Sequence, residues 1–271
     1  MKTATALRFR GYVSNESTGH MARSTAGAMH FDVQANRLAD VVLKAAAGNG
    51  GPRHLVNELV SAELAFRLGL PCPEPLLVRV PPDFAPIPPR HPDDDPVSGF
   101  CFALPYLHGN APPSLEQALH ATNASILAGI FVFDSWVANR DRTTPGNLIA
   151  VPMPRTGRSS IWMLDHGYTF GGPEWTPDSL AARVSAPAYG FPAALQPALL
   201  RHIRALDPWI ATIAHVSDDV IADVVAQVPT SWLPDAEERR ALSRYLSQRR
   251  QHLRAVIRES RPARSPAPPA G

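Results

Sequence analysis

Cysteine and long apolar runs are both scarce in this chain. Its two cysteines, Cys72 and Cys101, lie in apolar surroundings and fit no metal-ligand spacing, so buried thiols in a reducing compartment are expected. The longest apolar run, residues 126–133, is too short to cross a bilayer. The first 13 residues lack the apolar run of a signal peptide. We therefore expect a soluble, cytoplasmic protein with no membrane contact.

An excess of charge is also missing. Lys and Arg total 26 against 24 Asp and Glu, which leaves a net charge of +2 and gives no reason to propose a nucleic-acid partner. At 271 residues with 45% hydrophobic residues, the chain is long enough for one two-lobed domain or two small ones.

Proline, in contrast, is abundant and unevenly placed. Many of the 29 prolines fall in residues 71–96 and in the tail 261–271. Proline has no backbone donor for a central strand, so residues 81–97 are predicted to be a surface insertion between two strands. The composition of residues 261–271 is typical of a disordered tail.

The first part of the chain is predicted to form strands at residues 7–13, 29–33 and 38–45. Between the first two lies a segment, residues 14–27, rich in Ser, Thr, Asn and Gly. Its backbone N–H groups and hydroxyls are suited to cradling phosphates, but its glycines do not form GxGxxG. A plain hairpin loop explains the composition equally well, and both interpretations stay open.

A lysine in the third strand and a glutamate on the following helix form a candidate pair. Lys44 stands in an apolar strand and needs a partner or ligand, unless it lies on an edge strand and reaches water. Residues 53–68 show the apolar spacing of a helix. Five residues turn a helix by about 500°, so Glu58 and Glu63 project on different sides and at most one can face Lys44. Glu58, beside the apolar stripe, is the better candidate.

The remainder changes from strands to helices. Residues 74–80 and 99–104 are predicted strands, and 105–110 resembles a linker between lobes. After the linker the apolar periodicity predicts helices at 114–122, 125–137, 193–206, 218–227 and 235–259. The last of these is dense in arginine, which is typical of a solvated amphipathic helix and less so of a docking surface for an acidic partner.

Between these helices, residues 133–167 carry three polar residues in an apolar frame: Asp141, Asn147 and Asp165. A hairpin formed by 148–153 and 159–164 would bring the three together. One carboxylate to accept a proton, with an amide and a second carboxylate to hold magnesium, is the set that phosphoryl transfer requires.

Three phrases of the sequence resemble the HipA-like kinase family of bacteria. They are VVLKAAAGNGGPRHLVNELVSAELAFRLGLPCPEPLLV (41–78), FDSWVANRDRTTPGNLIAV (133–151) and WMLDHGYTF (162–170). The resemblance implies an α+β, two-lobed, protein-kinase-like fold. Its β-rich N-lobe, with one main helix, would span residues 1–106, and its mainly helical C-lobe would span 107–260.

The same resemblance implies roles for five residues. Lys44 would contact the α- and β-phosphates of ATP, and Glu58 would pair with Lys44. Asp141 would be the catalytic aspartate, whereas Asn147 and Asp165 would bind Mg²⁺. The implied activity is ATP- and Mg²⁺-dependent phosphoryl transfer to an unidentified acceptor, a serine or threonine hydroxyl on a protein.

The sequence departs from the kinase pattern in the spacing of two candidate site residues. Asp141 and Asn147 are separated by 147 − 141 = 6 positions where the pattern H-R-D-x-x-x-x-N has five. A bulge in the loop would absorb the extra residue. The alternative hypotheses are a nucleotide-binding pseudokinase that acts through partners, and an enzyme that transfers the nucleotide. Asp134 and Asn139 are expected to make capping or loop hydrogen bonds, and His166 to serve in packing or hydrogen bonding and not as a base.

Overall fold

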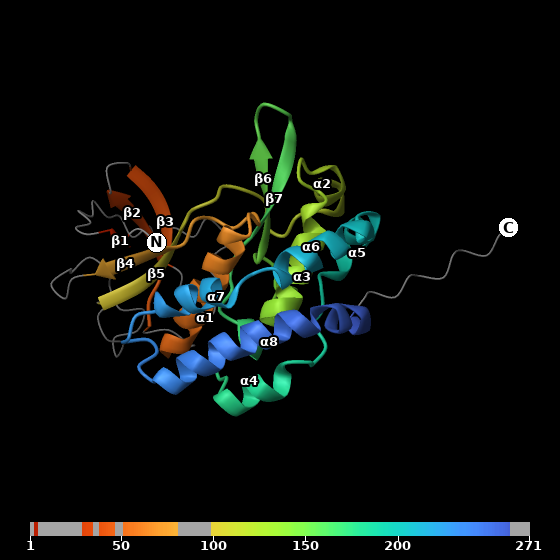
Figure 1. Cartoon of the computed structure of the whole chain (residues 1–271). Helices are drawn as coiled ribbons and strands as arrows, with labels where there is room; N and C mark the ends of the chain where they lie inside the picture. Colours follow the sequence, from red (N-terminus) through yellow and green to blue (C-terminus); the bar gives the residue numbers. More distant parts are fainter. Residues whose placement is uncertain (1–2, 5–28, 35–37, 47–50, 81–98, 261–271) are drawn as a thin grey trace.

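Helix α1 (Gly51–Arg67) lies between a sheet and a mainly helical region in the computed structural model of the chain (Figure 1). The structure describes residues 3–4, 29–34, 38–46, 51–80 and 99–260. The predicted strand at 7–13, the loop at 14–27, the insertion at 81–97 and the tail at 261–271 lie outside these residues.

The sheet has the strand order β1-β4-β5-β3-β2. Its neighbours pair antiparallel, except β1 with β4. Because β3 lies between β5 and β2, the alternative in which Lys44 sits on an edge strand is wrong. The predicted strand at 74–80 begins two residues late, after the last proline of that segment. The strands are β1 (Thr3–Ala4), β2 (Met29–Gln34), β3 (Leu38–Lys44), β4 (Leu76–Val80) and β5 (Gly99–Pro105).

Buried side chains surround α1 on all sides, and every residue from His54 to Ala65 is buried. The helix ends in a Schellman motif: Leu70 N donates to Ala65 O, and Gly69 N donates to Phe66 O, at 3.0 Å each. This motif needs a left-handed residue, and Gly69 supplies it with a φ of +70°. The helix therefore ends at Arg67, two residues after Ala65, its last buried residue.

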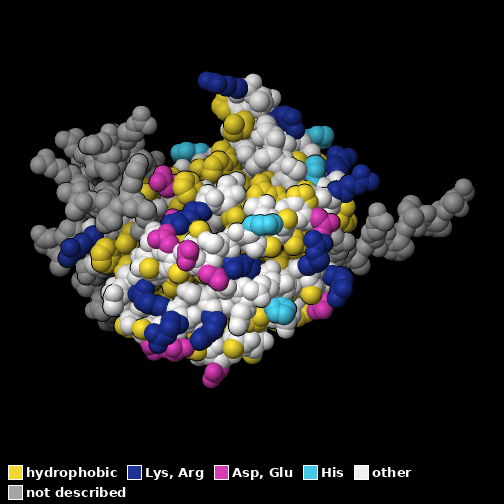
Figure 2. Space-filling view, viewed as in Figure 1, with side chains coloured by type: hydrophobic (Ala, Val, Ile, Leu, Met, Phe, Trp, Pro, Cys, Tyr) yellow, Lys and Arg dark blue, Asp and Glu magenta, His cyan; other side chains and the backbone are white. Residues whose placement is uncertain are grey.

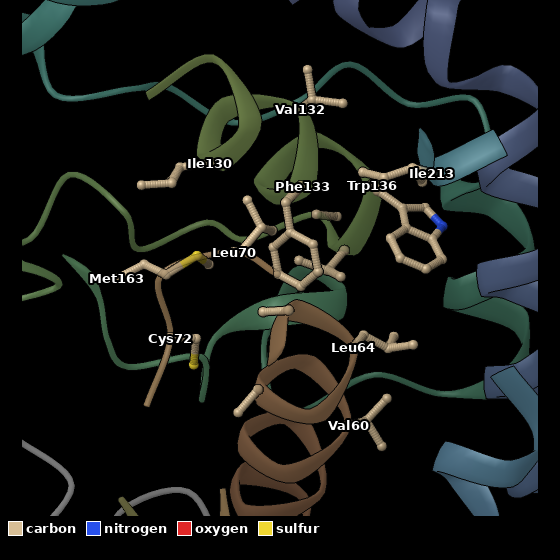
Figure 3. Close-up of a cluster of buried hydrophobic side chains, with 14 of the residues drawn as sticks. Val60, Leu64, Leu70, Cys72, Ile130, Val132, Phe133, Trp136, Met163 and Ile213 are labelled. Carbon is tan, nitrogen blue, oxygen red and sulfur yellow. The ribbon is translucent and has the colours of Figure 1, made fainter. Parts of the chain in front are cut away.

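The core continues from α1 into the helical region. Figure 3 shows Val60 and Leu64 of α1 on one side of this cluster and Phe133 and Trp136 of α3 (Ile126–Val137) on the other. Cys72, on the segment that follows α1, lies in the same cluster. The apolar contact thus joins the sheet-bearing half to the helical half directly.

The helical region contains a two-stranded hairpin, β6 (Leu148–Met153) with β7 (Arg158–Met163), close to the predicted one. A capping box begins α2, since Ser114 and Gln117 exchange hydrogen bonds. The helices of this region are α2 (Leu115–His120), α3, η1 (Thr169–Gly171), α4 (Pro177–Arg183), η2 (Ala193–Leu195), α5 (Gln196–Arg201), η3 (Ile203–Ala205), α6 (Leu206–Ala214), α7 (Asp218–Ala226) and α8 (Ala236–Ser260).

One helix prediction for this region is wrong, and two helices of the region were not predicted. The continuous helix expected at 193–206 is broken, because His202 departs from helical dihedrals with φ −110° and ψ 22°. A separate helix, α6, follows at Leu206 and was not predicted. Helix α4 was also missed, although Thr176 caps it and Pro177 begins it, because its seven residues are too few to show a period.

A buried arginine of α8 joins this helix to the main chain of two other segments of the helical region. Arg249 donates from Nε to the Ser135 carbonyl at 2.9 Å and from Nη1 to the carbonyls of Arg183 at 2.6 Å and Ala186 at 3.0 Å. Trp136 in turn donates to the Leu246 carbonyl at 2.9 Å. Helix α8 therefore binds the main chain of α3 and of the segment at the end of α4.

The exposed face of α8 carries mixed charge. Figure 2 shows basic and acidic side chains interspersed on the visible face of the molecule. Arg244 pairs with Glu237 at 2.8 Å, and Arg254 pairs with Asp207 at 2.7 Å. This pattern fits a solvated amphipathic helix. Among the described residues, none of the helices combines the length and the apolar character needed to span a membrane.

The two halves of the molecule are also tied by polar contacts. Arg67 of α1 pairs with Asp223 of α7 at 2.7 Å, and Trp232 donates to the Phe100 carbonyl of β5 at 3.2 Å. The linker joins β6 through reciprocal hydrogen bonds of 2.9 Å between the main chains of Asn110 and Ala150. The helical half therefore contacts the sheet half at more than the covalent connection.

Both cysteines should be unreactive in the folded protein. Burial raises the pKa of the Cys72 thiol far above its usual range and that of Cys101 to about 12, so neither forms a thiolate near neutral pH. We expect a chromogenic disulfide reagent to modify neither residue in native buffer and both in guanidinium chloride. Modification of native protein at the rate of a free thiol would contradict this arrangement.

Candidate active site

A buried ion network joins the sheet, α1 and the end of the hairpin. Lys44 Nζ lies 2.5 Å from Glu58 Oε1 and 3.1 Å from Asp165 Oδ2. Lys44 is 6% exposed and Glu58 is fully buried, so both charges depend on these partners. The second oxygen of Glu58 accepts the His166 backbone N–H at 2.9 Å. Of the two helix glutamates, the structure places Glu58 against Lys44, and Glu63 pairs instead with Arg67.

The network divides protons unequally between its two carboxyl groups. Burial raises the pKa of Glu58 to about 7, against the opposing charge of Lys44. Burial also acts to raise the pKa of Asp165, but the charge of Lys44 outweighs it and holds that pKa well below its usual range. For Lys44, burial is outweighed by the charges of Asp165 and Glu58, which raise its pKa. Asp165 is therefore the firmly ionised carboxylate.

Asp165 stands where the chain leaves the hairpin. Leu148 and Met163 are opposite each other in the register, and Leu164 N donates to the Asn147 carbonyl at 3.0 Å. Asp165 follows with a φ of +53°, a left-handed conformation that is uncommon for residues other than glycine, although aspartate adopts it more readily than most. The turn begins at this residue. It brings the carboxylate to Lys44 and the next N–H to Glu58.

Asp141 lies in the loop that follows α3. The helix is ended by Ala138, with a φ of +49°, and the Asn139 side chain then accepts the Asp141 backbone N–H at 3.0 Å. Both carboxylate oxygens of Asp141 accept hydrogen bonds, one from the Thr144 hydroxyl and the other from Asn147 Nδ2 at 2.9 Å. The side chain is half-buried, so it is oriented and still reaches solvent.

The turn after Asp141 accommodates the extra residue that separates it from Asn147. Thr144 N donates to the Asp141 carbonyl at 3.0 Å, and Asn147 N donates to the Thr144 carbonyl at 3.2 Å. Gly146 closes the turn with a φ of +106°, which glycine adopts without strain. The structure therefore brings Asn147 to Asp141 despite the spacing of six.

Arg142, which the sequence did not single out, lies beneath this loop with 1% of its surface exposed. It donates twice to Asp134, at 2.8 and 3.1 Å, and also to the carbonyls of Asn147 and, at 2.6 Å, of Leu164. One guanidinium thus fixes the main chain beside Asn147 and Asp165. The available clue was an arginine next to a candidate aspartate. The burial of Arg142 could not be seen from this neighbour, because it depends on partners as distant in sequence as Leu164.

The chain resembles known proteins in both sequence and fold. The family model for HipA-like kinases matches residues 41–260. The chain belongs to the HipA-like kinase family. The structure of the Helicobacter pylori proinflammatory kinase CtkA aligns with a TM-score of 0.55 and 13% identity, covering 89% of this chain and 94% of that chain. The structure of hydra Fam20 with sugar aligns with a TM-score of 0.48 and 14% identity, covering 87% and 83%. No curated protein matches.

Membership of this family makes the chain a kinase, and its fold is the two-lobed protein-kinase-like fold that the sequence predicted. The β-rich half carries Lys44 and Glu58, and the mainly helical half carries Asp141, Asn147 and Asp165. The division at residues 106 and 107 stays a prediction.

The kinase offers oxygen ligands suited to a hard divalent cation. Asn147 turns its amide nitrogen to Asp141, so its amide oxygen points elsewhere and makes no hydrogen bond within the described part of the chain. Asp165 adds an ionised carboxylate whose side chain is 22% exposed. His54, Glu58 and Asp165 also place ligand atoms within 4.8 Å of one another, and within that group Glu58 is engaged by the Lys44 ammonium at 2.5 Å and by the His166 N–H at 2.9 Å.

His54 and His166 of the kinase are neutral packing residues. Burial lowers the pKa of His54 to about 4, and the charge of Lys44 lowers it further. Burial likewise holds the pKa of His166 well below its usual range, and its ring packs edge-on against Phe133 with centroids 6.2 Å apart. The expectation that His166 serves in packing agrees with this placement.

The His54 ring restricts what can follow Asp165. A Cβ built on Gly167 would lie 1.9 Å from His54 Nε2, far inside van der Waals contact. We expect Gly167→Ala to destabilise the kinase by about 1–3 kcal/mol, the usual cost of overpacking a buried site. Urea unfolding measures this loss.

His54→Ala removes the obstructing ring and provides the matched test. The double variant Gly167→Ala/His54→Ala should lose less stability than the sum of the two single variants, because contacting residues do not act independently. Costs that simply add would show that the two positions do not clash.

Proposed function

We propose that this kinase transfers the γ-phosphoryl group of ATP, with Mg²⁺, to a serine or threonine hydroxyl of a protein. The observation that carries the proposal is that these five side chains lie in one connected group. Asn147 contacts Asp141, and in the hairpin register Asn147 lies opposite Leu164, the residue before Asp165. Asp165 in turn contacts Lys44, which pairs with Glu58. The nucleotide would lie between the N-lobe, residues 1–106, and the C-lobe, residues 107–260.

Lys44 is the group proposed to hold the α- and β-phosphates. A lysine ammonium is a compact point charge, and Glu58 already holds it by direct contact. Because α1 is buried on every side, Glu58 is itself fixed in place. Lys44 also contacts Asp165 at 3.1 Å. Bound phosphates would take over that contact, since their oxygens offer the same negative charge.

Asp141 is proposed as the catalytic residue. Its carboxylate accepts the proton of the acceptor hydroxyl as the hydroxyl oxygen forms its bond to the γ-phosphorus. The bond between that phosphorus and the bridging oxygen breaks, and ADP leaves with the electron pair. The hydrogen bonds from Thr144 and Asn147 hold the carboxylate in one orientation for this transfer.

Asn147 and Asp165 are the proposed ligands of Mg²⁺. A cation held by these two side chains would supply positive charge to offset the negative charge that develops on the phosphate oxygens. The protein's part is to present an amide oxygen and an ionised carboxylate from a rigid hairpin end. Arg142 holds that end through the Asn147 and Leu164 carbonyls.

The alternative of an inactive nucleotide-binding protein drew on the spacing of six between Asp141 and Asn147. The turn closed by Gly146 absorbs that spacing, which favours an active enzyme. Transfer of the nucleotide instead of the phosphoryl group depends on residues 14–27, which lie outside the described residues. Both alternatives are outcomes of the first experiment.

Asp141→Asn should abolish phosphoryl transfer and leave nucleotide binding largely intact. Loss of a general base lowers a rate by about 10²–10⁴-fold, whereas the amide keeps the size of the side chain. The measurement is incubation with γ-labelled ATP, Mg²⁺ and either protein. Label on protein, or released phosphate, in the wild type alone is expected. Equal transfer by the variant would refute the role of Asp141, and label from α-labelled ATP would indicate nucleotide transfer.

Asp165→Ala should remove the magnesium dependence of nucleotide binding. The variant loses the ionised carboxylate and leaves Lys44 paired with Glu58. Calorimetric titration of a non-hydrolysable ATP analogue, with and without Mg²⁺, measures the difference. In the wild type Mg²⁺ should tighten binding, and in the variant it should not. An unchanged magnesium effect would refute Asp165 as a ligand.

A further inference from the structure

One face of α1 binds the main chain that follows Asp165. Asn57, fully buried on this face, donates from Nδ2 to the carbonyls of Gly167 and Thr169, each at 2.9 Å. Its Oδ1 accepts the indole N–H of Trp175 at 2.9 Å. Both amide hydrogens and the oxygen are therefore used, and the side chain has a single orientation that satisfies them.

The residues around Asn57 bind the same segment. Ser61, one turn further along α1, donates to the Thr169 hydroxyl at 2.9 Å, and that hydroxyl donates to the His166 carbonyl at 2.9 Å. Arg53, one turn earlier, lies over the Trp175 ring with its guanidinium carbon 4.8 Å from the centroid. Asn57 thus lies at the centre of a set of contacts that spans residues 166–175.

This set of contacts bears directly on the geometry of Asp165. Glu58 binds the N–H of His166, and the adjacent Asn57 binds the carbonyl of Gly167. The two residues that follow Asp165 are therefore held from consecutive positions of one helix. These contacts fix the main chain on the C-terminal side of Asp165, whose left-handed φ of +53° costs free energy in a residue other than glycine.

We propose that Asn57 is a positioning residue for the metal site: it fixes the backbone after Asp165 and so aims the carboxylate, and Trp175 fixes the amide of Asn57. The inference rests on the proposed role of Asp165 as a magnesium ligand. Residues that orient a metal ligand from behind contribute to affinity although they do not touch the ion.

Asn57→Leu tests the proposal, because leucine has a similar size and makes none of the three hydrogen bonds. The readout is the Mg²⁺ concentration that half-saturates the tightening of ATP-analogue binding, measured by calorimetry. We expect that concentration to rise about 10-fold or more, within the range seen when such supporting residues are lost. Binding of the analogue without metal should be unchanged, and saturating Mg²⁺ should restore the turnover rate.

Asn123→Leu is the matched control. Asn123 also makes two side-chain hydrogen bonds to main chain, with the N–H and the carbonyl of Ile161 in β7 at 2.8 and 2.9 Å. Its loss should lower the melting temperature without changing the magnesium midpoint. A purely structural role for Asn57 predicts the same behaviour for Asn57→Leu, and that result would overturn the proposal.

Trp175→Phe is the second variant, and it keeps the test decisive if Asn57→Leu does not fold. It removes the N–H that Asn57 accepts and retains an aromatic ring. A smaller shift of the magnesium midpoint in the same direction is expected, and an unshifted midpoint would contradict the proposal. Wild-type protein whose nucleotide binding ignores Mg²⁺ would instead refute the proposed function of Asp165.

Discussion

The buried ion pair between Lys44 and Glu58 is the constraint on which the rest of this kinase depends. Two charges have been taken out of water at the contact of a central strand with a helix, and each needs its partner at hydrogen-bond distance. Removing one partner of such a pair costs about 3–5 kcal/mol, because the other is left buried and unpaired. Asp165 and the His166 N–H complete the pair from the opposite lobe. The same ion pair therefore contributes both to the stability of the core and to the order of the site.

A second buried charge pair, Arg142 with Asp134, serves the helical lobe in the same way. The two pairs meet on adjacent residues, since Arg142 binds the Leu164 carbonyl and Lys44 binds the Asp165 carboxylate. The main chain just after β7 is therefore held from both lobes, by Arg142 at the Leu164 carbonyl and by Glu58 at the His166 N–H. This arrangement explains how an aspartate in an unfavourable backbone conformation can be part of a fully packed structure.

Local patterns in the sequence predicted what local physics determines. Apolar periodicity found α1, and rotation about its axis separated Glu58 from Glu63. Strand and turn signals located the hairpin that Asn147 and Asp165 flank. The same methods missed Arg142 and Asn57, because polar residues on a buried face are recognised only by partners distant in sequence. Asn57 bonds to residues 110 and 112 positions away. Short helices such as α4 were lost for a different reason, since one or two turns show no period.

The hydrogen bonds between Asn110 and Ala150 have a mechanical consequence. They pair the connection between the lobes with strand β6, so the connection is attached to the β6–β7 hairpin. Gly109 tightens the join, because a Cβ there would lie 2.5 Å from the Ala150 carbonyl oxygen. The hairpin projects away from the body of the molecule (Figure 1). Hairpin and connection are therefore one hydrogen-bonded unit, whose tip at residues 152–158 is exposed to solvent.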